Sequence, residues 1–188
     1  MGKLVVTEFV SLDGVMEDPG GAEGFEHGGW TFQFDRGPEG DKFKLDELMA
    51  SDAQLLGRRT YEGFAQAWPS IKDESGFADK MNAMPKFVVS STLENADWNN
   101  TTVLSGNVPD EVSRLKQQFD GDILVAGSAQ LAQSLLQHDL VDELRLMVFP
   151  VVLGSGKRLF ADRAEMSAFT LVEARQTGSV AILTLRRA

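Results

Sequence analysis

The sequence predicts a single α/β domain with three layers: a mixed, mostly parallel sheet with helices on both faces and antiparallel strands at its C-terminal end. Short apolar segments alternate with segments of helical period up to about residue 136. After that point helical segments cease, and strand-like segments follow one another across short turns. The chain has 188 residues, 43% of them hydrophobic, which is enough for one well-packed core and too little for two.

The expected strands are short runs rich in β-branched and aromatic residues. The first, KLVVTEFVSL at 3–12, is typical, since Val, Thr and Phe suit a pleated, half-buried surface. Gly178 and Ser179 mark the turn of the last hairpin. The remaining segments expected as strands are 53–57, 86–91, 101–105, 122–127, 142–154, 168–177 and 179–187.

The expected helices carry recognisable boundary signals. Pro38 lies in the first turn of one helix, although Gly40 weakens its start, and another helix stops before Pro69. A third begins at an Asn or Asp cap with an early proline, and the fourth places leucines on one stripe. These helices are expected at 38–50, 58–68, 107–119 and 128–140. The loop 13–37 is long enough to suggest a function.

Composition excludes several classes of function. With 18 basic and 28 acidic residues, the net charge of -10 argues against nucleic acid and anionic membranes as partners. No membrane span or secretory signal is recognisable, so a cytoplasmic protein is expected. The absence of cysteine and the wide separation of His27 and His138 argue against disulfides, thiol chemistry and a zinc site. Any catalysis is therefore expected to depend on a cofactor.

The segment GRRTYEGF brings two arginines to one strand-to-helix junction. Ligands of such sheets bind where strand carboxyl ends meet helix N-termini, because free N–H groups and the helix dipole attract anions there. Gly57 permits a tight turn, and Arg58, Arg59 and Thr60 open the next helix. Guanidinium groups suit a phosphate monoester, although solvation or pairing with Glu62 is the simpler role.

A second junction of the same kind follows the strand ILVAG. Gly127 and Ser128 open a helix with small residues that let a phosphate approach the backbone. Ser90 and Ser91, at the end of KFVVSS, could donate hydrogen bonds to the phosphate that the arginines bind. Alternatively, the glycines only end strands and the serines only begin a turn. The three strand ends together predict a nucleotide site without identifying the nucleotide.

In order and context, the segments GRRTYEGF, KFVVSS and ILVAGSAQLAQSLL resemble the dihydrofolate reductase superfamily. SLDGVMEDPGG and VDELRLMVFPVVLGSGKRLF resemble one branch of it, the RibD C-terminal (riboflavin biosynthesis reductase) domain family with its stand-alone bacterial members. The resemblance spans about residues 3–187. It implies a dihydrofolate reductase-like fold, a homodimer, and an NADPH-dependent reductase acting on a small heterocyclic or carbonyl compound, similar to 5-amino-6-(5-phosphoribosylamino)uracil reductase.

The resemblance also implies where NADPH binds. The arginines and Ser90 or Ser91 would surround the 2′-phosphate, and Thr60 and the second junction would hold the pyrophosphate. Ala126-Gly127 stands where dihydrofolate reductases have Gly-Gly with a cis peptide, which leaves the geometry of that bond open. The implied cofactor-binding residues are Val6, Gly14, Val15, Gly57, Arg58, Arg59, Thr60, Ser90, Ser91, Ala126, Gly127, Ser128, Ala129, Gln130 and Leu131.

Two acidic residues are candidates for catalysis. Counting back from Gly57 reaches Asp41, near the position of the pterin-binding carboxylate of dihydrofolate reductases, but the Trp-x-x-Pro-x-Asp pattern around it is missing. Asp13, in the shared SLDG motif, is the second candidate, with a turn-capping role as its alternative. Trp30 and Phe34 could stack on a flat substrate or plug the core beneath the loop.

Three functions remain open from the sequence. The first is the reductase just described, with NADPH supplying the hydride and the protein orienting the acceptor. The second is a true dihydrofolate reductase, and the third is a nucleotide-binding protein without turnover. The chain has no deaminase-like part with His and Cys zinc ligands, so the preceding deamination of the bifunctional enzymes is not expected of it.

Overall fold

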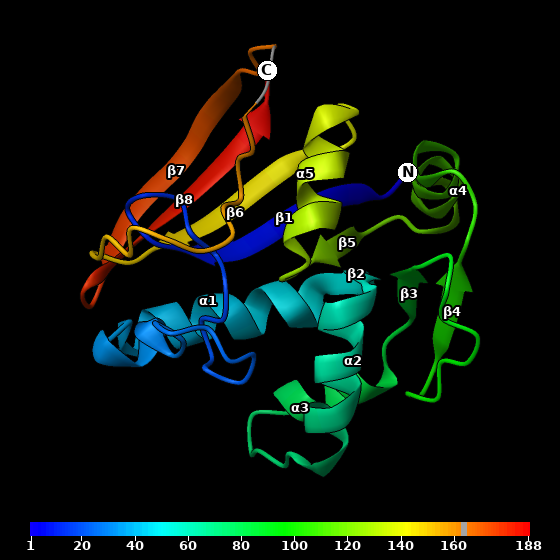
Figure 1. Cartoon of the computed structure of the whole chain (residues 1–188), viewed down its shortest axis with the longest axis horizontal. Helices are drawn as coiled ribbons and strands as arrows, with labels where there is room; N and C mark the ends of the chain where they lie inside the picture. Colours follow the sequence, from blue (N-terminus) through cyan, green and yellow to red (C-terminus); the bar gives the residue numbers. More distant parts are fainter. Residues whose placement is uncertain (163–164) are drawn as a thin grey trace.

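The computed structural model describes residues 1–162 and 165–188 (Figure 1). Its strands form one sheet in the order β4-β3-β2-β5-β1-β6-β8-β7. The strand bounds are β1 (Lys3–Val10), β2 (Ser51–Gly57), β3 (Lys86–Val89), β4 (Thr101–Leu104), β5 (Asp122–Val125), β6 (Glu143–Val148), β7 (Phe169–Thr177) and β8 (Val180–Arg187). The helices are α1 (Gly37–Ala50), α2 (Arg58–Ala67), α3 (Phe77–Ala83), α4 (Val108–Gln118) and α5 (Ala129–Gln137). Two short 3-10 helices, Trp30–Gln33 and Trp68–Ser70, complete the set.

The predicted α/β architecture with a mixed, mostly parallel sheet is confirmed. β1 lies in the middle of the sheet, parallel to β5 on one side and to β6 on the other. β8 pairs antiparallel with both β6 and β7, so among the described strands it alone runs against the rest. The expected antiparallel tail therefore starts one strand later than the sequence indicated, because β6 continues the parallel part.

Alternate residues of β1 face two different cores, which is what a strand covered on both sides requires. Leu4 and Val6 pack with apolar residues of α4 and α5 on one face, whereas Val5 packs with residues of α1, α2 and α3 on the other. In Figure 1 the long α1 lies along one side of the sheet and α5 along the other. Among the described residues, none of the helices combines the length and apolar character of a membrane span.

Two elements differ from the sequence prediction. The segment expected as a strand over 142–154 ends as β6 at Val148, since the chain turns at Pro150, which lacks the N–H that a strand ladder uses. The seven-residue α3 was not predicted. It depends on the Asp73 carboxylate, which accepts hydrogen bonds from the N–H groups of Phe77 and Ala78 at the start of the helix.

The loop between β1 and α1 is tied to the chain that follows β6. Met16 N–H donates to the Lys157 carbonyl at 2.8 Å, and Leu159 N–H donates to the Gly14 carbonyl at 3.0 Å. This pairing places the start of the loop across the carboxyl end of β1. The loop therefore borders the same sheet edge as the two glycine-containing junctions.

Candidate functional site

The two strand-to-helix junctions predicted from the sequence contact each other directly. Gly57 N–H, at the end of β2, donates to Ser128 Oγ at 2.9 Å. In return, Ser128 N–H donates to Thr60 Oγ1, in the first turn of α2, at 2.8 Å. β2 and β5 are parallel neighbours, so their carboxyl ends meet at one edge of the sheet. The structure thus joins the two junctions into one continuous, hydrogen-bonded unit at this edge.

The second junction is a tight turn in a left-handed conformation. Gly127 has a φ of +61° and Ser128 a φ of +60°. A Cβ atom on Gly127 would lie 3.0 Å from Thr60 Cγ2 and Oγ1, so the turn has no room for a side chain there. The first N–H groups of α5 have no intrahelical acceptor, as in any helix, and Ser128 makes no side-chain cap to them. The Ala126-Gly127 peptide is trans, as are all peptides described.

The two arginines lie at the outer end of this edge. Arg58 Nε pairs with Glu62 Oε1 at 2.9 Å, as the simpler interpretation of the sequence proposed, and its guanidinium also donates to Thr92 Oγ1. Arg59 is exposed, and within the described part of the chain it forms no ion pair. Thr92 belongs to the turn after β3. The first turn of α2 and the end of β3 are therefore adjacent, as binding of one phosphate would require.

Ser90 organises that turn. Its Oγ accepts hydrogen bonds from Thr92 N–H at 3.2 Å and Leu93 N–H at 3.0 Å, which is the turn-forming role considered above. Ser91 is exposed beside it. Of the implied residues near the nicotinamide, Val6 and Val15 are fully buried, so only their backbone could face a cofactor. Gly14 adopts a φ of +78° at the loop entrance.

Asp13 is placed as a clamp between two loops. Its carboxylate accepts hydrogen bonds from Ser11 Oγ at 2.6 Å, Leu153 N–H at 3.1 Å and Gly154 N–H at 2.9 Å. Led by the Ser11 hydroxyl, these bonds lower the pKa of Asp13 from its usual 3.8 to about 2. The group is ionised at neutral pH, so it cannot serve there as a proton donor.

Replacing Asp13 by Asn is expected to remove a pH-dependent part of the stability. Because the folded-state pKa is about 2, the ionised carboxylate stabilises the fold fully above its usual 3.8 and less as the pH falls towards 2. Urea unfolding of the wild type and of D13N is the measurement. The difference in unfolding free energy should be greatest near pH 6 and should shrink near pH 2. A difference that does not change with pH would contradict the clamp.

The other residues proposed for chemistry lie away from the junctions. Asp41 is exposed on α1 and pairs with Arg36 Nε at 2.5 Å. Trp30 is 1% exposed, its ring lies edge-on to Phe149 at 5.4 Å, and its indole N–H donates to a backbone carbonyl, which matches the core-plug alternative. Phe34 is half-buried in the same cluster.

A buried polar cluster between β1, α1 and β6 was missed at the sequence level. Lys44 Nζ donates to Thr7 Oγ1 at 2.7 Å and pairs with Glu47 Oε2 at 2.5 Å. Thr7 Oγ1 also donates to that carboxylate, and Arg145 Nη1 lies 3.6 Å from its second oxygen. Lys44 Nζ stands 5.2 Å from the centre of the Phe9 ring. The signal that could have found the cluster is Thr7, a polar residue within an apolar strand.

The cluster adjoins the second junction. The last β1–β5 pair is Val6 with Val125, so Thr7 is the first β1 residue beyond the end of β5. On its other side Thr7 pairs with Arg145 of β6. A ligand group at the Ala126-Gly127 turn would therefore lie next to the strand segment that carries Thr7 and Phe9.

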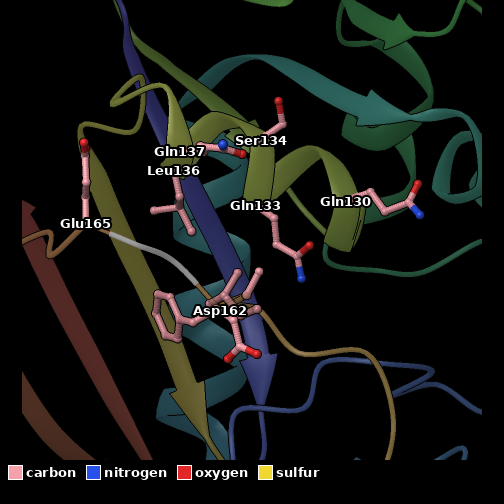
Figure 2. Close-up of a pocket in the computed structure, with 10 residues that line it drawn as sticks. Gln130, Gln133, Ser134, Leu136, Gln137, Asp162 and Glu165 are labelled. Atoms are coloured by element: carbon pink, nitrogen blue, oxygen red, sulfur yellow. The ribbon is translucent and has the colours of Figure 1, made fainter.

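A separate cavity of about 470 Å³ lies on the outer side of α5, between this helix and the segment around Asp162 (Figure 2). Gln130 is the one implied cofactor residue among those that line it. Among the described residues that line it, Asp162 and Glu165 are charged, and the others are amides, a hydroxyl and apolar groups. None of Arg58, Arg59 and Gly127 is among these described residues, so the cavity does not coincide with the junction site.

Comparisons with known proteins agree with this geometry. A family model described as "RibD C-terminal domain" matches residues 2–183. YyaP of Bacillus subtilis (strain 168) is 29% identical over 180 residues, covering 94% of this chain and 90% of that protein. A crystal structure described as a "putative riboflavin biosynthesis protein" from Shewanella sp. PV-4 superposes with a TM-score of 0.79 at 21% identity, covering 99% of both chains. RibD of Acinetobacter baumannii superposes with a TM-score of 0.67 at 18% identity, over 58% of its own length.

Proposed function

The chain belongs to the RibD C-terminal domain family, and we propose on this basis that it is an NADPH-dependent reductase of a small heterocyclic or carbonyl compound. The observation that carries the proposal is the hydrogen-bonded contact between the Gly57–Thr60 and Gly127–Ser128 junctions. It places two helix N-termini side by side, which is an arrangement suited to a pyrophosphate. Bound NADPH would supply the hydride.

The residues present fit such a dinucleotide. Gly127 permits the left-handed turn that packs tightly against Thr60, and Ser128 brings the uncapped start of α5, whose N–H groups a phosphate could bind, to the same place. Arg58 and Arg59 would bind the 2′-phosphate. Arg58 would give up its exposed pair with Glu62, which costs little because surface ion pairs contribute about 0–1 kcal/mol.

On the acceptor side, we propose the Lys44, Glu47 and Thr7 cluster with Phe9 as the binding surface for a flat, polar ring. Lys44 offers hydrogen-bond donors, Thr7 and Glu47 fix its position, and the half-buried Phe9 ring adds an apolar group beside it. The related structures include a riboflavin biosynthesis protein and a pyrimidine reductase-like protein from Corynebacterium diphtheriae. A pyrimidine is accordingly the first class of acceptor to test.

Two measurements test the function. Quenching of tryptophan fluorescence should give a dissociation constant for NADPH at least tenfold below that for NADH. NADPH oxidation, followed by absorbance, should then be fastest with an aminopyrimidine or carbonyl acceptor rather than with dihydrofolate. Turnover of dihydrofolate would favour the second candidate function, and binding without turnover of any acceptor would favour the third. Binding of neither dinucleotide at about millimolar concentration would exclude the proposal.

We also propose a homodimer in the cytoplasm. β7 is an edge strand of the sheet, and its Leu171 and Val172 side chains are 56% and 47% exposed. Exposed edge strands of this kind favour pairing with a second copy. Sedimentation that yields a monomer at micromolar concentration would contradict the dimer, and recovery of the protein outside the cytosolic fraction would contradict the location.

A further inference from the structure

The central strand contains a carboxyl group that the proposed function does not use. Glu8 is 6% exposed in β1, between the apolar residues of VVTEFV. Its Oε2 accepts a hydrogen bond from Gly127 N–H at 3.0 Å. Its Oε1 is buried and has no hydrogen-bond partner among the described residues. A buried polar atom without a partner is costly, so its retention in the core calls for a role.

The position of Glu8 connects it to the junction site. Side chains alternate along β1, so Glu8 shares the α4 and α5 face with Leu4, Val6 and Val10. It lies two residues beyond the last β1–β5 pair, directly behind the Gly127 turn. The turn is therefore held from two sides, by Thr60 Oγ1 at Ser128 N–H and by Glu8 at Gly127 N–H.

We propose that Glu8 is a positioning residue of the dinucleotide site, whose buried carboxyl group holds the Gly127–Ser128 turn from within the core. This inference rests on the proposed function, since the turn is where the pyrophosphate would bind. Glu8 does not touch the substrate or the reacting atoms. It acts through the backbone that the cofactor would contact.

The charge of Glu8 then affects binding. Burial raises the pKa of Glu8 well above its usual 4.5, opposed by the Gly127 N–H and the charge of Lys44 and assisted by the charge of Glu47. α5 contributes no charged side chain, and β6 contributes Leu146 opposite Glu8. While the acid is neutral, it places no negative charge behind the turn. Ionisation would place a carboxylate behind it, so affinity for an anionic cofactor should fall as the pH rises through the pKa of Glu8.

The test compares the wild type, Glu8→Gln and Glu8→Leu. In the protein without cofactor, the Gly127 amide resonance should titrate with a midpoint well above pH 4.5 in the wild type and should not titrate in E8Q. NADPH affinity, measured on both sides of that midpoint, should fall at least fivefold in the wild type as the pH rises through it, beyond any fall in E8Q. Below the wild-type midpoint, E8Q should bind within about threefold of the wild type, whereas E8L should bind at least tenfold more weakly.

The possible results separate the two proposals. Equal affinities of E8L and the wild type, or one pH profile shared by the wild type and E8Q, would overturn the positioning role. If E8L does not fold, the E8Q profile and the Gly127 titration decide the matter. A titrating Gly127 amide with no NADPH binding in any variant would exclude the dinucleotide site while leaving the link between Glu8 and the turn in place. If the Gly127 amide resonance titrates identically in E8Q and in the wild type, Glu8 does not hold the turn.

Discussion

Replacing both Arg58 and Arg59 by alanine is expected to weaken NADPH binding about 100-fold and NADH binding less than about threefold. A hydrogen bond to a charged group contributes about 1.5–3 kcal/mol, and each 1.4 kcal/mol corresponds to a tenfold change in affinity. Only NADPH carries the 2′-phosphate that these side chains would bind, so NADH serves as the internal reference. Titration of both dinucleotides against the variant, followed by tryptophan fluorescence, is the measurement.

Arg114→Ala is the matched control for loss of positive charge. Arg114 lies on α4 with a side chain that is 63% exposed and pairs with Glu111, much as Arg58 pairs with Glu62. Its removal should leave NADPH binding within about twofold, because exposed charges beyond a screening length of roughly 10 Å have little effect at 0.1 M salt. Equal losses in R114A and in the double variant would mean that the arginines act only through net charge, which would contradict a phosphate site.

Gly127→Ala is expected to lower the unfolding free energy by about 2 kcal/mol and NADPH affinity at least tenfold. A left-handed φ costs a non-glycine residue roughly 1–2 kcal/mol, and Gly127 has a φ of +61°. The added Cβ would also lie 3.0 Å from Thr60 Cγ2, so the turn or the first turn of α2 must shift. Urea unfolding and NADPH titration measure the two effects.

Gly63→Ala is the control for this substitution. Gly63 lies in α2, and a Cβ atom there would meet nothing within 4 Å. Alanine stabilises a helix interior by up to about 1 kcal/mol relative to glycine, so G63A should be as stable as the wild type or more so and should bind NADPH normally. A G127A protein with wild-type stability and affinity would show that the turn can accommodate a side chain. That result would contradict the proposed role of Gly127 in the dinucleotide site.

Much of this structure follows from local patterns. The β1 segment, the end of α2 before Pro69, the N-cap of α4 and both glycine junctions could be predicted because their signals lie within a few residues of the chain. The contact between the junctions, Ser128 N–H to Thr60 Oγ1, also follows once β2 and β5 are parallel neighbours. The short α3 was missed because its start depends on one carboxylate rather than on an apolar period.

The polar groups inside the core could not be predicted in the same way. Glu8 contacts a backbone N–H 119 residues away, and Lys44 reaches Thr7 across 37 residues. Both contacts depend on how α1 and the turn before α5 pack on β1, which periodicity within one segment does not specify. Asp13 shows the same limit in part: the Ser11 hydroxyl, which lowers its pKa most, lies in the recognised motif, but its two backbone hydrogen bonds come from residues 153 and 154.

The most direct test of a dinucleotide site at the two junctions is a map of backbone amide shifts in the 188-residue protein on addition of NADPH. With NADPH, the largest shifts should fall on residues 57–60, 90–92 and 126–131. NADH should shift the amides of residues 126–131 and leave those of Arg58 and Arg59 unchanged. Shifts confined to the residues that line the cavity beside α5, or no shifts at about millimolar NADPH, would contradict a dinucleotide site at the junctions.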